Sequence, residues 1–397
     1  IVAGGAIGSQ GVTFALDANG DGGSDITVKA GQQVRLESGL LASGDVTVTG
    51  GTPGLDDSWN GAQMGAGSNR LSVLVNTSGG ITAAGLGASG AGSTVTVEGA
   101  GRIELMGWIN AGGKLRQTFD AQGNMLSQDV VWSGRDSDIF IQSDERAFIG
   151  GTTLNQAGQA VETGGYLNAS RLIDVKGGID VATGVGLYVH PAAELVVEGR
   201  WNANHSVNLT PGKIQLYGVN DVNMQGLLLA GGRSEMVRDA AGKYIGRNIV
   251  HYDVDSEIEV QADRQLIIGT DISAGKRVDL VGGLDARAES VGSPYTGRGL
   301  VLYGSASVST TRANSEINLN APGRVDILAP GDVNELVFSD WPIAANGRLA
   351  QDVTLILQID KVSFTVEAAV TVTAASTASN TSIEDLLSDL NAAMVNA

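Results

Sequence analysis

Residues 26–51 read ITVKAGQQVRLESGLLASGDVTVTGG, in which short runs of alternating apolar and polar residues are separated by glycines. Residues 258–283 read IEVQADRQLIIGTDISAGKRVDLVGG and align with the first stretch without a gap. Alternation with a period of two residues, bounded by glycine, is typical of half-buried strands. The two stretches therefore predict short strands that recur along the chain.

A second internal repeat divides the chain into larger units. Residues 103–151 align with 222–270 without a gap, so that IELMGWINAGGKLRQTFDAQGN corresponds to VNMQGLLLAGGRSEMVRDAAGK. Together the repeats predict about three imperfect units of ~115 residues each. We expect these units to fill residues 1–330, followed by a connecting hairpin or linker at 331–351 and a separate module at 352–397.

The expected fold is all-β, a right-handed parallel β-solenoid with protruding hairpins. No helical pattern lies between successive strands before about residue 380, so the crossover helices of an α/β protein are not expected. Gly-rich corners between short strands, with aliphatic side chains stacked inside, are typical of a solenoid. At about 22 residues per turn and about 4.8 Å between turns, the solenoid would be about 70 Å long.

The corners and the hairpins have separate sequence signals. A serine followed by an acidic residue precedes several strands, as at Ser137-Asp138 and Ser256-Glu257, and we expect these side chains to cap backbone amides. Hairpin turns are predicted where an Asx side chain is followed by glycine in the form D-A-x-G. These turns, with two close variants, are at 17–20, 120–123, 239–242, 155–158 and 344–347.

The tail is predicted to be a β–β–α module. Its expected strands run through Val353, Leu355, Leu357 and Ile359 and through Val362, Phe364 and Val366, joined by a turn at Asp360-Lys361. Thr381 and Glu384 have the spacing of a capping box. Five residues at helical spacing predict one apolar face: Ile383, Leu386, Leu387, Leu390 and Met394. Such a module could cap the last turn of the solenoid or dock onto the next subunit.

Composition excludes several classes of function. The formal net charge of −18 repels phosphate backbones, so nucleic acid is not expected as a partner. The chain has no Cys, which excludes disulfides and thiolate chemistry, and only 3 His. No apolar run is long enough to span a membrane as a helix. Because Ile1 begins without a signal-like segment, we expect a piece of a longer, exported protein.

The string DANGDGGSD contains the candidate metal site. Asp17, Asn19, Asp21 and Asp25 occupy positions one, three, five and nine of a calcium loop, and oxygen ligands at such positions can wrap Ca²⁺. Position twelve is Val28, which cannot replace the usual bidentate glutamate. The motif is therefore either a calcium site or a plain hairpin turn, and Ca²⁺ is the one cofactor that the sequence suggests.

A second acidic cluster could carry catalysis. Asp253, Asp255 and Glu257 follow His251 just before a predicted strand. Paired carboxylates on a solenoid could serve a polysaccharide lyase or a glycosidase. The equivalent position of the preceding repeat lacks the histidine and one acid, which favours corner capping over catalysis. We therefore assign no catalytic residues.

The repeats at about residues 20–330 resemble those of filamentous-haemagglutinin-like proteins and other giant bacterial surface adhesins. The resemblance is carried by blocks such as ITVKAGQQVRLESGLLASGDVTVTGG and VDLVGGLDARAESVG. The tail is similar to β–β–α modules repeated in very large bacterial extracellular proteins. These resemblances imply an extracellular, self-associating or adhesive protein with a β-helical shaft.

The leading hypothesis is a structural or adhesive protein that forms a rod or filament segment on a bacterial surface. Its partners would be further copies, flanking parts of a larger chain, or surface glycans. Two alternatives stay open: a polysaccharide lyase or tailspike-like glycosidase, and a passive glycan-binding adhesin module.

Overall fold

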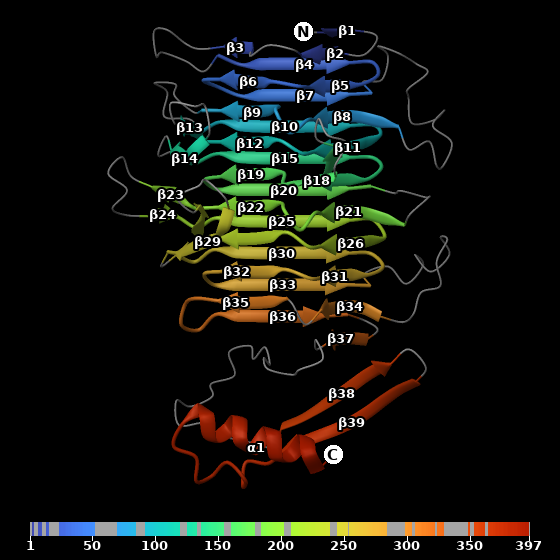
Figure 1. The fold of residues 1–397 in the computed structure, drawn as a ribbon, viewed down its shortest axis with the longest axis vertical. Helices are drawn as coiled ribbons and strands as arrows, with labels where there is room; N and C mark the ends of the chain where they lie inside the picture. Colours follow the sequence, from blue (N-terminus) through green and yellow to red (C-terminus); the bar gives the residue numbers. More distant parts are fainter. Residues whose placement is uncertain are drawn as a thin grey trace. The chain divides into compact units, whose positions relative to one another are not determined.

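The structure is a computed structural model that divides the chain into two compact units, Ile1–Val325 and Asp326–Ala397 (Figure 1). The residues that it describes are 2–3, 7–9, 13–15, 24–51, 70–84, 92–119, 125–132, 136–154, 160–178, 184–201, 208–238, 244–252, 254–283, 298–303, 306–321, 324–328, 348–349, 353–361 and 364–396.

The first unit is a parallel β-solenoid built from three long sheets. Sheet A consists of β1 (Val2–Ala3), β4 (Ile26–Ala30), β7 (Val46–Gly50), β10 (Thr94–Gly99), β15 (Asp138–Ser143), β20 (Leu172–Gly177), β25 (Lys213–Gly218), β30 (Glu257–Ala262), β33 (Arg277–Gly282) and β36 (Glu316–Asn320). Sheet B consists of β2 (Ile7–Ser9), β5 (Val34–Leu36), β8 (Leu71–Val75), β11 (Arg102–Leu105), β16 (Ala147–Ile149), β21 (Val185–Val189), β26 (Asp221–Met224), β31 (Leu266–Ile268), β34 (Arg298–Tyr303) and β37 (Arg324–Leu328). Sheet C consists of β3 (Thr13–Ala15), β6 (Gly39–Ala42), β9 (Gly80–Ala83), β12 (Trp108–Ala111), β19 (Tyr166–Ala169), β22 (Glu194–Val197), β27 (Leu227–Ala230), β32 (Asp271–Ala274) and β35 (Ser307–Thr310).

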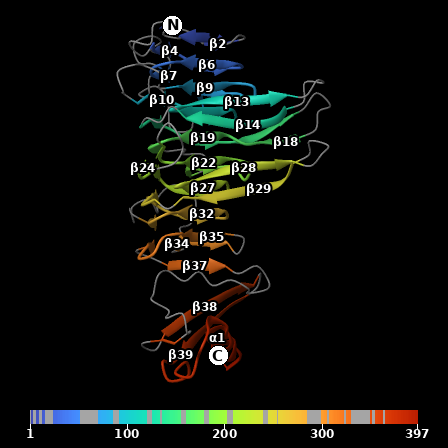
Figure 2. The same cartoon turned by 90° about the vertical axis from the view of Figure 1, so that its left-hand side faces the viewer.

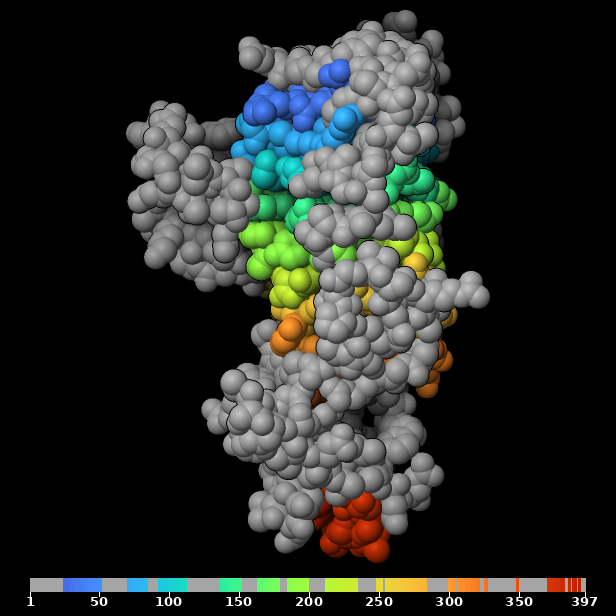
Figure 3. All heavy atoms as spheres, turned by 90° about the vertical axis from the view of Figure 1, so that its right-hand side faces the viewer, coloured from blue at the N-terminus to red at the C-terminus, as the bar shows by residue number. Residues whose placement is uncertain are grey.

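Each turn of the chain, here called a rung, contributes one strand to each sheet, and like strands stack one above the next (Figure 1). The last described rung contributes β36 and β37 to sheets A and B, with no described strand in sheet C. Figure 3 views the molecule from the side of sheet B, where the described residues of successive rungs form parallel coloured bands. This arrangement confirms the predicted parallel β-solenoid.

Columns of aliphatic side chains fill the core. In sheet A, register partners in consecutive strands form one column: Ile26, Val46, Val95, Ile139, Ile173, Ile214, Ile258, Val278 and Ile317. All members before Ile317 are buried. Among the described residues, the buried apolar side chains are Ala, Val, Ile, Leu and Met, with no aromatic ring. The described core is therefore aliphatic.

The sequence repeat corresponds to three rungs. A shift of 119 residues places β11 on β26, β12 on β27 and β15 on β30, with the starting residue of each strand in register. The shift of 232 residues places β4 within β30 and β7 within β33, which are six rungs further along sheet A. The aligned glycines and aliphatic residues thus occupy the same corner or column in each copy.

The expected length of about 70 Å was wrong. The ten strands of sheet A are separated by nine steps of about 4.8 Å, which gives about 43 Å. Rungs differ in size, because β4 and β7 start 20 residues apart (46 − 26) whereas β7 and β10 start 48 apart (94 − 46). Corner insertions lengthen the chain without adding rungs.

In the described part of the solenoid, four antiparallel hairpins are inserted at the corners. They are β13 (Gly113–Phe119) with β14 (Met125–Trp132), β17 (Gly151–Leu154) with β18 (Ala160–Thr163), β23 (Arg200–Trp201) with β24 (Asn208–Thr210), and β28 (Gly232–Arg238) with β29 (Tyr244–His251). Three of them flank the turns predicted at 120–123, 155–158 and 239–242, which confirms those hairpins.

The hairpin turn predicted at 17–20 stays a prediction. The strands on either side of it, β3 and β4, pair in parallel within sheets C and A, as do β12 and β15 on either side of hairpin β13–β14. Residues 17–20 themselves, and the turn predicted at 344–347, lie outside the described residues.

Hairpin β28–β29 packs on the solenoid. Val196, Leu227 and Leu229 lie on the outer face of sheet C, where they form a small buried cluster with Ile249 of β29 packed against it. Figure 2 shows the long hairpins β13–β14 and β28–β29 on the side of sheet C. This face of the sheet is therefore covered by the chain itself.

The second unit contains the predicted β–β–α module. Strands β38 (Val353–Lys361) and β39 (Phe364–Val372) form an antiparallel pair, and α1 spans Ile383–Asn396. Val370 and Val372 of β39 pack with Leu386 and Leu390 of α1. The turn predicted at Asp360-Lys361 was wrong, because both residues lie in β38 and pair with Thr365 and Phe364. Val362 lies outside the described residues.

The capping box at the start of α1 lies one residue later than predicted. The backbone N–H of Asp385 donates to Ser382 Oγ (3.3 Å), and the N–H of Ser382 donates to Asp385 Oδ2 (3.1 Å). The N–H and Oγ of Thr381 also donate to Asp385 Oδ2. Since α1 begins at Ile383, Ser382 is the N-cap, and its third helical residue is Asp385, not Glu384.

Within the described part of the chain, no helix has the length and apolar character that a membrane crossing requires.

Candidate functional site

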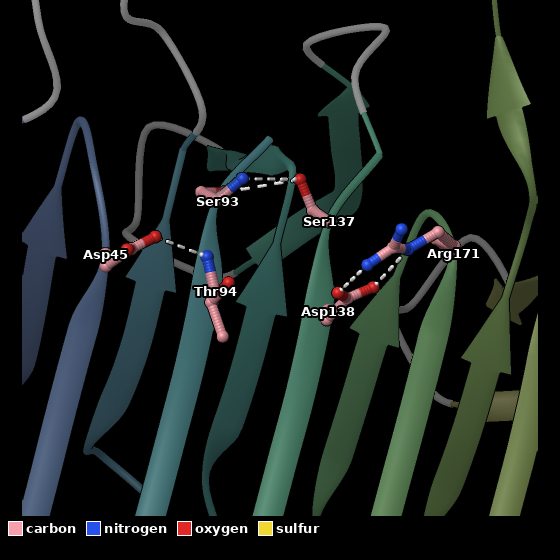
Figure 4. Close-up of polar contacts among 6 residues, drawn as sticks. All are labelled: Asp45, Ser93, Thr94, Ser137, Asp138 and Arg171. Atoms are coloured by element: carbon pink, nitrogen blue, oxygen red, sulfur yellow. Dashed lines mark hydrogen bonds and ion pairs between the residues drawn. The ribbon is translucent and has the colours of Figure 1, made fainter. Parts of the chain in front are cut away.

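The corner that leads into sheet A is held together by side chains that bind backbone amides of neighbouring rungs (Figure 4). The N–H of Asp45 donates to Asp25 Oδ1 (2.7 Å), and the N–H of Thr94 donates to Asp45 Oδ1 (2.7 Å). The N–H of Ser93 donates to Ser137 Oγ (3.1 Å). The expected capping role of the Ser-acid corners is thus observed, and it joins one rung to the next.

Two ion pairs strengthen other corners. Arg171 Nε donates to Asp138 Oδ1 (2.8 Å), and this hydrogen bonding raises the pKa of Arg171 (Figure 4). Arg264 Nε donates to Asp221 Oδ1 (2.6 Å), and both side chains are largely buried. Asp138 is buried and Arg171 is half exposed, so both pairs neutralise a buried carboxylate between neighbouring rungs and contribute to the shaft.

The candidate calcium loop is only partly described. Asp17, Asn19 and Asp21 lie outside the described residues. Asp25 is exposed, and its carboxylate accepts the N–H of Asp45 in the corner ladder. Among the described residues, no group of three or more His, Asp or Glu side chains is arranged to hold a metal ion. Calcium at this loop stays a prediction.

The described residues of the candidate catalytic cluster contact different partners and do not converge on one site. Asp255 is exposed and forms an ion pair with Arg312 (2.9 Å), whereas Glu257 lies 4.0 Å from Lys213 Nζ on the next strand of sheet A. His251, at the end of β29, is also exposed. Asp253 lies outside the described residues.

A ladder of charged side chains crosses the outer face of sheet A near its last strands. Lys213 Nζ lies 3.1 Å from Glu259 Oε2, and Gln215 Nε2 donates to the same oxygen (3.1 Å). One strand further, Asp279 is paired with Arg277 and accepts a hydrogen bond from Asn318 Nδ2 (2.7 Å). Acid and base therefore converge here, as the enzyme alternative requires.

The pKa shifts in this ladder do not favour acid catalysis. Burial raises the pKa of Glu259, but hydrogen bonds from Gln215 and Lys213 outweigh it and leave the pKa below its ordinary value. Burial likewise raises the pKa of Asp279, and Arg277 and Asn318 bring it below its ordinary value. Both carboxyls are ionised at neutral pH, whereas a general acid needs a raised pKa.

The outer face of sheet B carries two neighbouring rings, here called the aromatic strip: Phe148 and Tyr188. Phe148 and Tyr188 are register partners on β16 and β21, with ring centroids 5.4 Å apart and planes tilted by 60°. His190 meets Tyr188 edge-on at 6.2 Å, but it follows β21, is buried, and accepts the N–H of Ala192 at Nδ1 (3.2 Å). Arg146 stacks its guanidinium 3.8 Å above the Phe148 ring. Rings and a planar cation therefore lie side by side on one surface.

Sequence reasoning missed the aromatic strip, although a local signal exists. Phe148 lies between buried Ala147 and Ile149, and Tyr188 lies between buried Leu187 and Val189. The alternation of each strand therefore predicts that its ring points outward. The contact between the two rings could not be predicted from the sequence, because they are 40 residues apart (188 − 148) and meet only through strand register.

Comparison with known proteins gives no relatives. No protein family matches the sequence, no curated protein matches it, and no solved structure matches the fold.

Proposed function

We propose that this chain is a structural, adhesive segment of an extracellular fibre on a bacterial surface, and that copies join end to end through the open edge of the solenoid. The resemblance of the repeats to those of giant surface adhesins supports the location. The parallel solenoid supports the mechanical role, because inter-rung hydrogen bonds and aliphatic columns make a stiff shaft.

The observation that carries the proposal is the last strand of sheet A. Among the strands that the structure describes, β36 pairs with β33 on one side and is the last of sheet A. Ile317 and Leu319 of β36 are partly exposed, whereas their register partners Val278 and Leu280 are fully buried. An edge strand with exposed apolar side chains favours pairing with another strand. Completing the burial of each side chain would contribute about 1 to 2 kcal/mol.

The test compares two neighbouring substitutions on β36. Leu319→Lys introduces a charge into the apolar column, and Asn320→Lys introduces the same charge at an exposed position of the same strand. We expect the wild type and Asn320→Lys to form longer particles as concentration rises, and Leu319→Lys to need at least tenfold more protein. Sedimentation velocity and negative-stain images measure the assembly, and circular dichroism checks that each variant is folded.

Two results would overturn the proposal. One is a wild-type chain that stays strictly monomeric at high concentration, with and without Ca²⁺. The other is a folded Leu319→Lys variant that assembles as readily as Asn320→Lys, which would place the contact elsewhere. The lyase or glycosidase alternative would require turnover of a polysaccharide, and loss of that turnover in Asp255→Asn.

A further inference from the structure

We propose that the outer face of sheet B binds a neutral polysaccharide and that the aromatic strip is the centre of this site. The inference rests on the adhesive part of the proposed function and gives its ligand a chemical class. End-to-end assembly does not depend on it, because β36 belongs to sheet A and the strip to sheet B.

The first step of the argument is the position of the rings. The described apolar core is filled by aliphatic columns, so Phe148 and Tyr188 are not needed to fill it. Both rings stand on the outer side of their strands and are partly exposed. An apolar surface kept on the outside of a sheet points to a ligand with an apolar face of its own.

The second step is the set of polar side chains beside the rings. On the preceding strand, Glu104 is held by Arg102 Nε at 2.9 Å. Beyond Tyr188, Gln225 Nε2 donates to Asn223 Oδ1 (2.7 Å). Carboxylate, guanidinium and amide groups thus flank the strip on both sides. A sugar ring has an apolar C–H face for stacking and a rim of hydroxyls for such groups, which is the mixed character that this surface matches.

The third step is charge and periodicity. A net charge of −18 repels nucleic acid, anionic lipid surfaces and acidic polysaccharides, so among glycans it favours a neutral one. Strands β11, β16, β21 and β26 present their side chains at intervals of about 4.8 Å along the solenoid. A repeating surface of this kind suits a repeating ligand, namely a chain of sugars rather than a single one.

The test uses leucine substitutions that keep an apolar side chain but remove the ring. Phe148→Leu and Tyr188→Leu change the strip, and Phe140→Leu is the matched control. Phe140 lies on β15 in the same rung, outward on sheet A, and is also partly exposed. Binding is measured by electrophoresis in native gels that contain neutral glycans in turn: glucans, mannan, galactan and soluble chitin oligomers. Alginate and pectate are the acidic comparisons.

We expect at least one neutral glycan to retard the wild type and Phe140→Leu. Each strip variant should bind that glycan about tenfold more weakly, a loss of about 1.4 kcal/mol, because the stacking surface of the ring is removed. Folding and assembly should be unchanged in all three variants.

The proposal is overturned if no neutral glycan binds, if only the acidic polysaccharides bind, or if the strip variants bind as well as Phe140→Leu. Because assembly is measured on the same proteins, a failure of glycan binding is distinct from a failure of the filament. Retained binding by Leu319→Lys would show that the two surfaces act separately.

Discussion

Ser256 shows how a single side chain connects separate parts of the solenoid. It is fully buried before β30, its Oγ donates to the carbonyl of Ala230 (2.7 Å), and it accepts the N–H of Gly275 (2.7 Å). Ser137, which occupies the same place three rungs earlier, accepts the N–H of Ser93. The recurrent serine therefore satisfies backbone groups that a corner would otherwise bury without partners.

Removing this hydroxyl tests the corner directly. Ser256→Ala leaves a buried carbonyl and a buried N–H without their side-chain partner, so it should lower the free energy of unfolding by about 1 to 3 kcal/mol. Ser307→Ala, at a partly exposed position of β35, should change it by less than about 0.5 kcal/mol. Urea unfolding followed by circular dichroism measures both, and equal midpoints would show that the corner bonds contribute nothing.

At the scale of elements, α1 shows what local spacing can and cannot resolve. The apolar spacing predicted the helix, and the burial of Leu386 and Leu390 confirms part of its inward face. The capping residue was wrong by one position, since Thr381-x-x-Glu384 and Ser382-x-x-Asp385 fit the same rule equally well. Which serine or threonine is the N-cap depends on the path of the preceding chain.

The pH dependence of this cap can be predicted from its hydrogen bonds. Donation by the N–H and hydroxyl of Thr381, and by Ser382, holds the pKa of Asp385 below its ordinary value of 3.8. A lowered pKa in the folded state stabilises the helix above the ordinary value, and this stabilisation is lost as the pH falls through the lowered pKa.

Asp385→Ala should therefore speed amide hydrogen exchange in α1 several-fold at pH 7. The difference from the wild type should shrink once the pH is below about 3.8. Glu384→Ala, the neighbouring residue, should leave exchange unchanged at pH 7. Equal effects of the two substitutions would contradict the assignment of Asp385 as the capping carboxylate.

At the scale of the whole molecule, the core columns of sheet A have members at their end that are less buried than those in their middle. Ile173 and Ile317 belong to the same column of sheet A, but Ile173 is fully buried between two strands and Ile317 is partly exposed on the last one. The identical residue thus has two environments, and the difference comes only from its place in the stack.

This difference in burial predicts that removing each isoleucine side chain lowers the free energy of unfolding by a different amount. Ile173→Ala should lower the free energy of unfolding by about 2 to 5 kcal/mol, and Ile317→Ala by roughly half as much in dilute solution. If copies join through β36, the cost of Ile317→Ala should rise at concentrations where the wild type assembles. Denaturant unfolding at low and high protein concentration measures this, and a cost that is independent of concentration would contradict the end-to-end contact.

Much of the fold was predictable because its signals are local. Alternation of period two predicts strands, D-A-x-G predicts hairpin turns, and the recurrence of the same corner residues after 119 positions predicts stacked rungs. Rung length could not be predicted, since an insertion and an extra rung look alike in a sequence.

The sequence by itself determined that this chain coils into a parallel β-solenoid with a β–β–α tail, because strand period, glycine corners and helix spacing depend on neighbouring residues. Tertiary structure alone decided which side chains share a surface. Phe148 meets Tyr188, and Leu229 meets Ile249, only after inter-rung register and hairpin packing are set. Strand pairing acts between residues tens of positions apart, so both candidate surfaces, the β36 edge and the aromatic strip, are properties of the assembled stack.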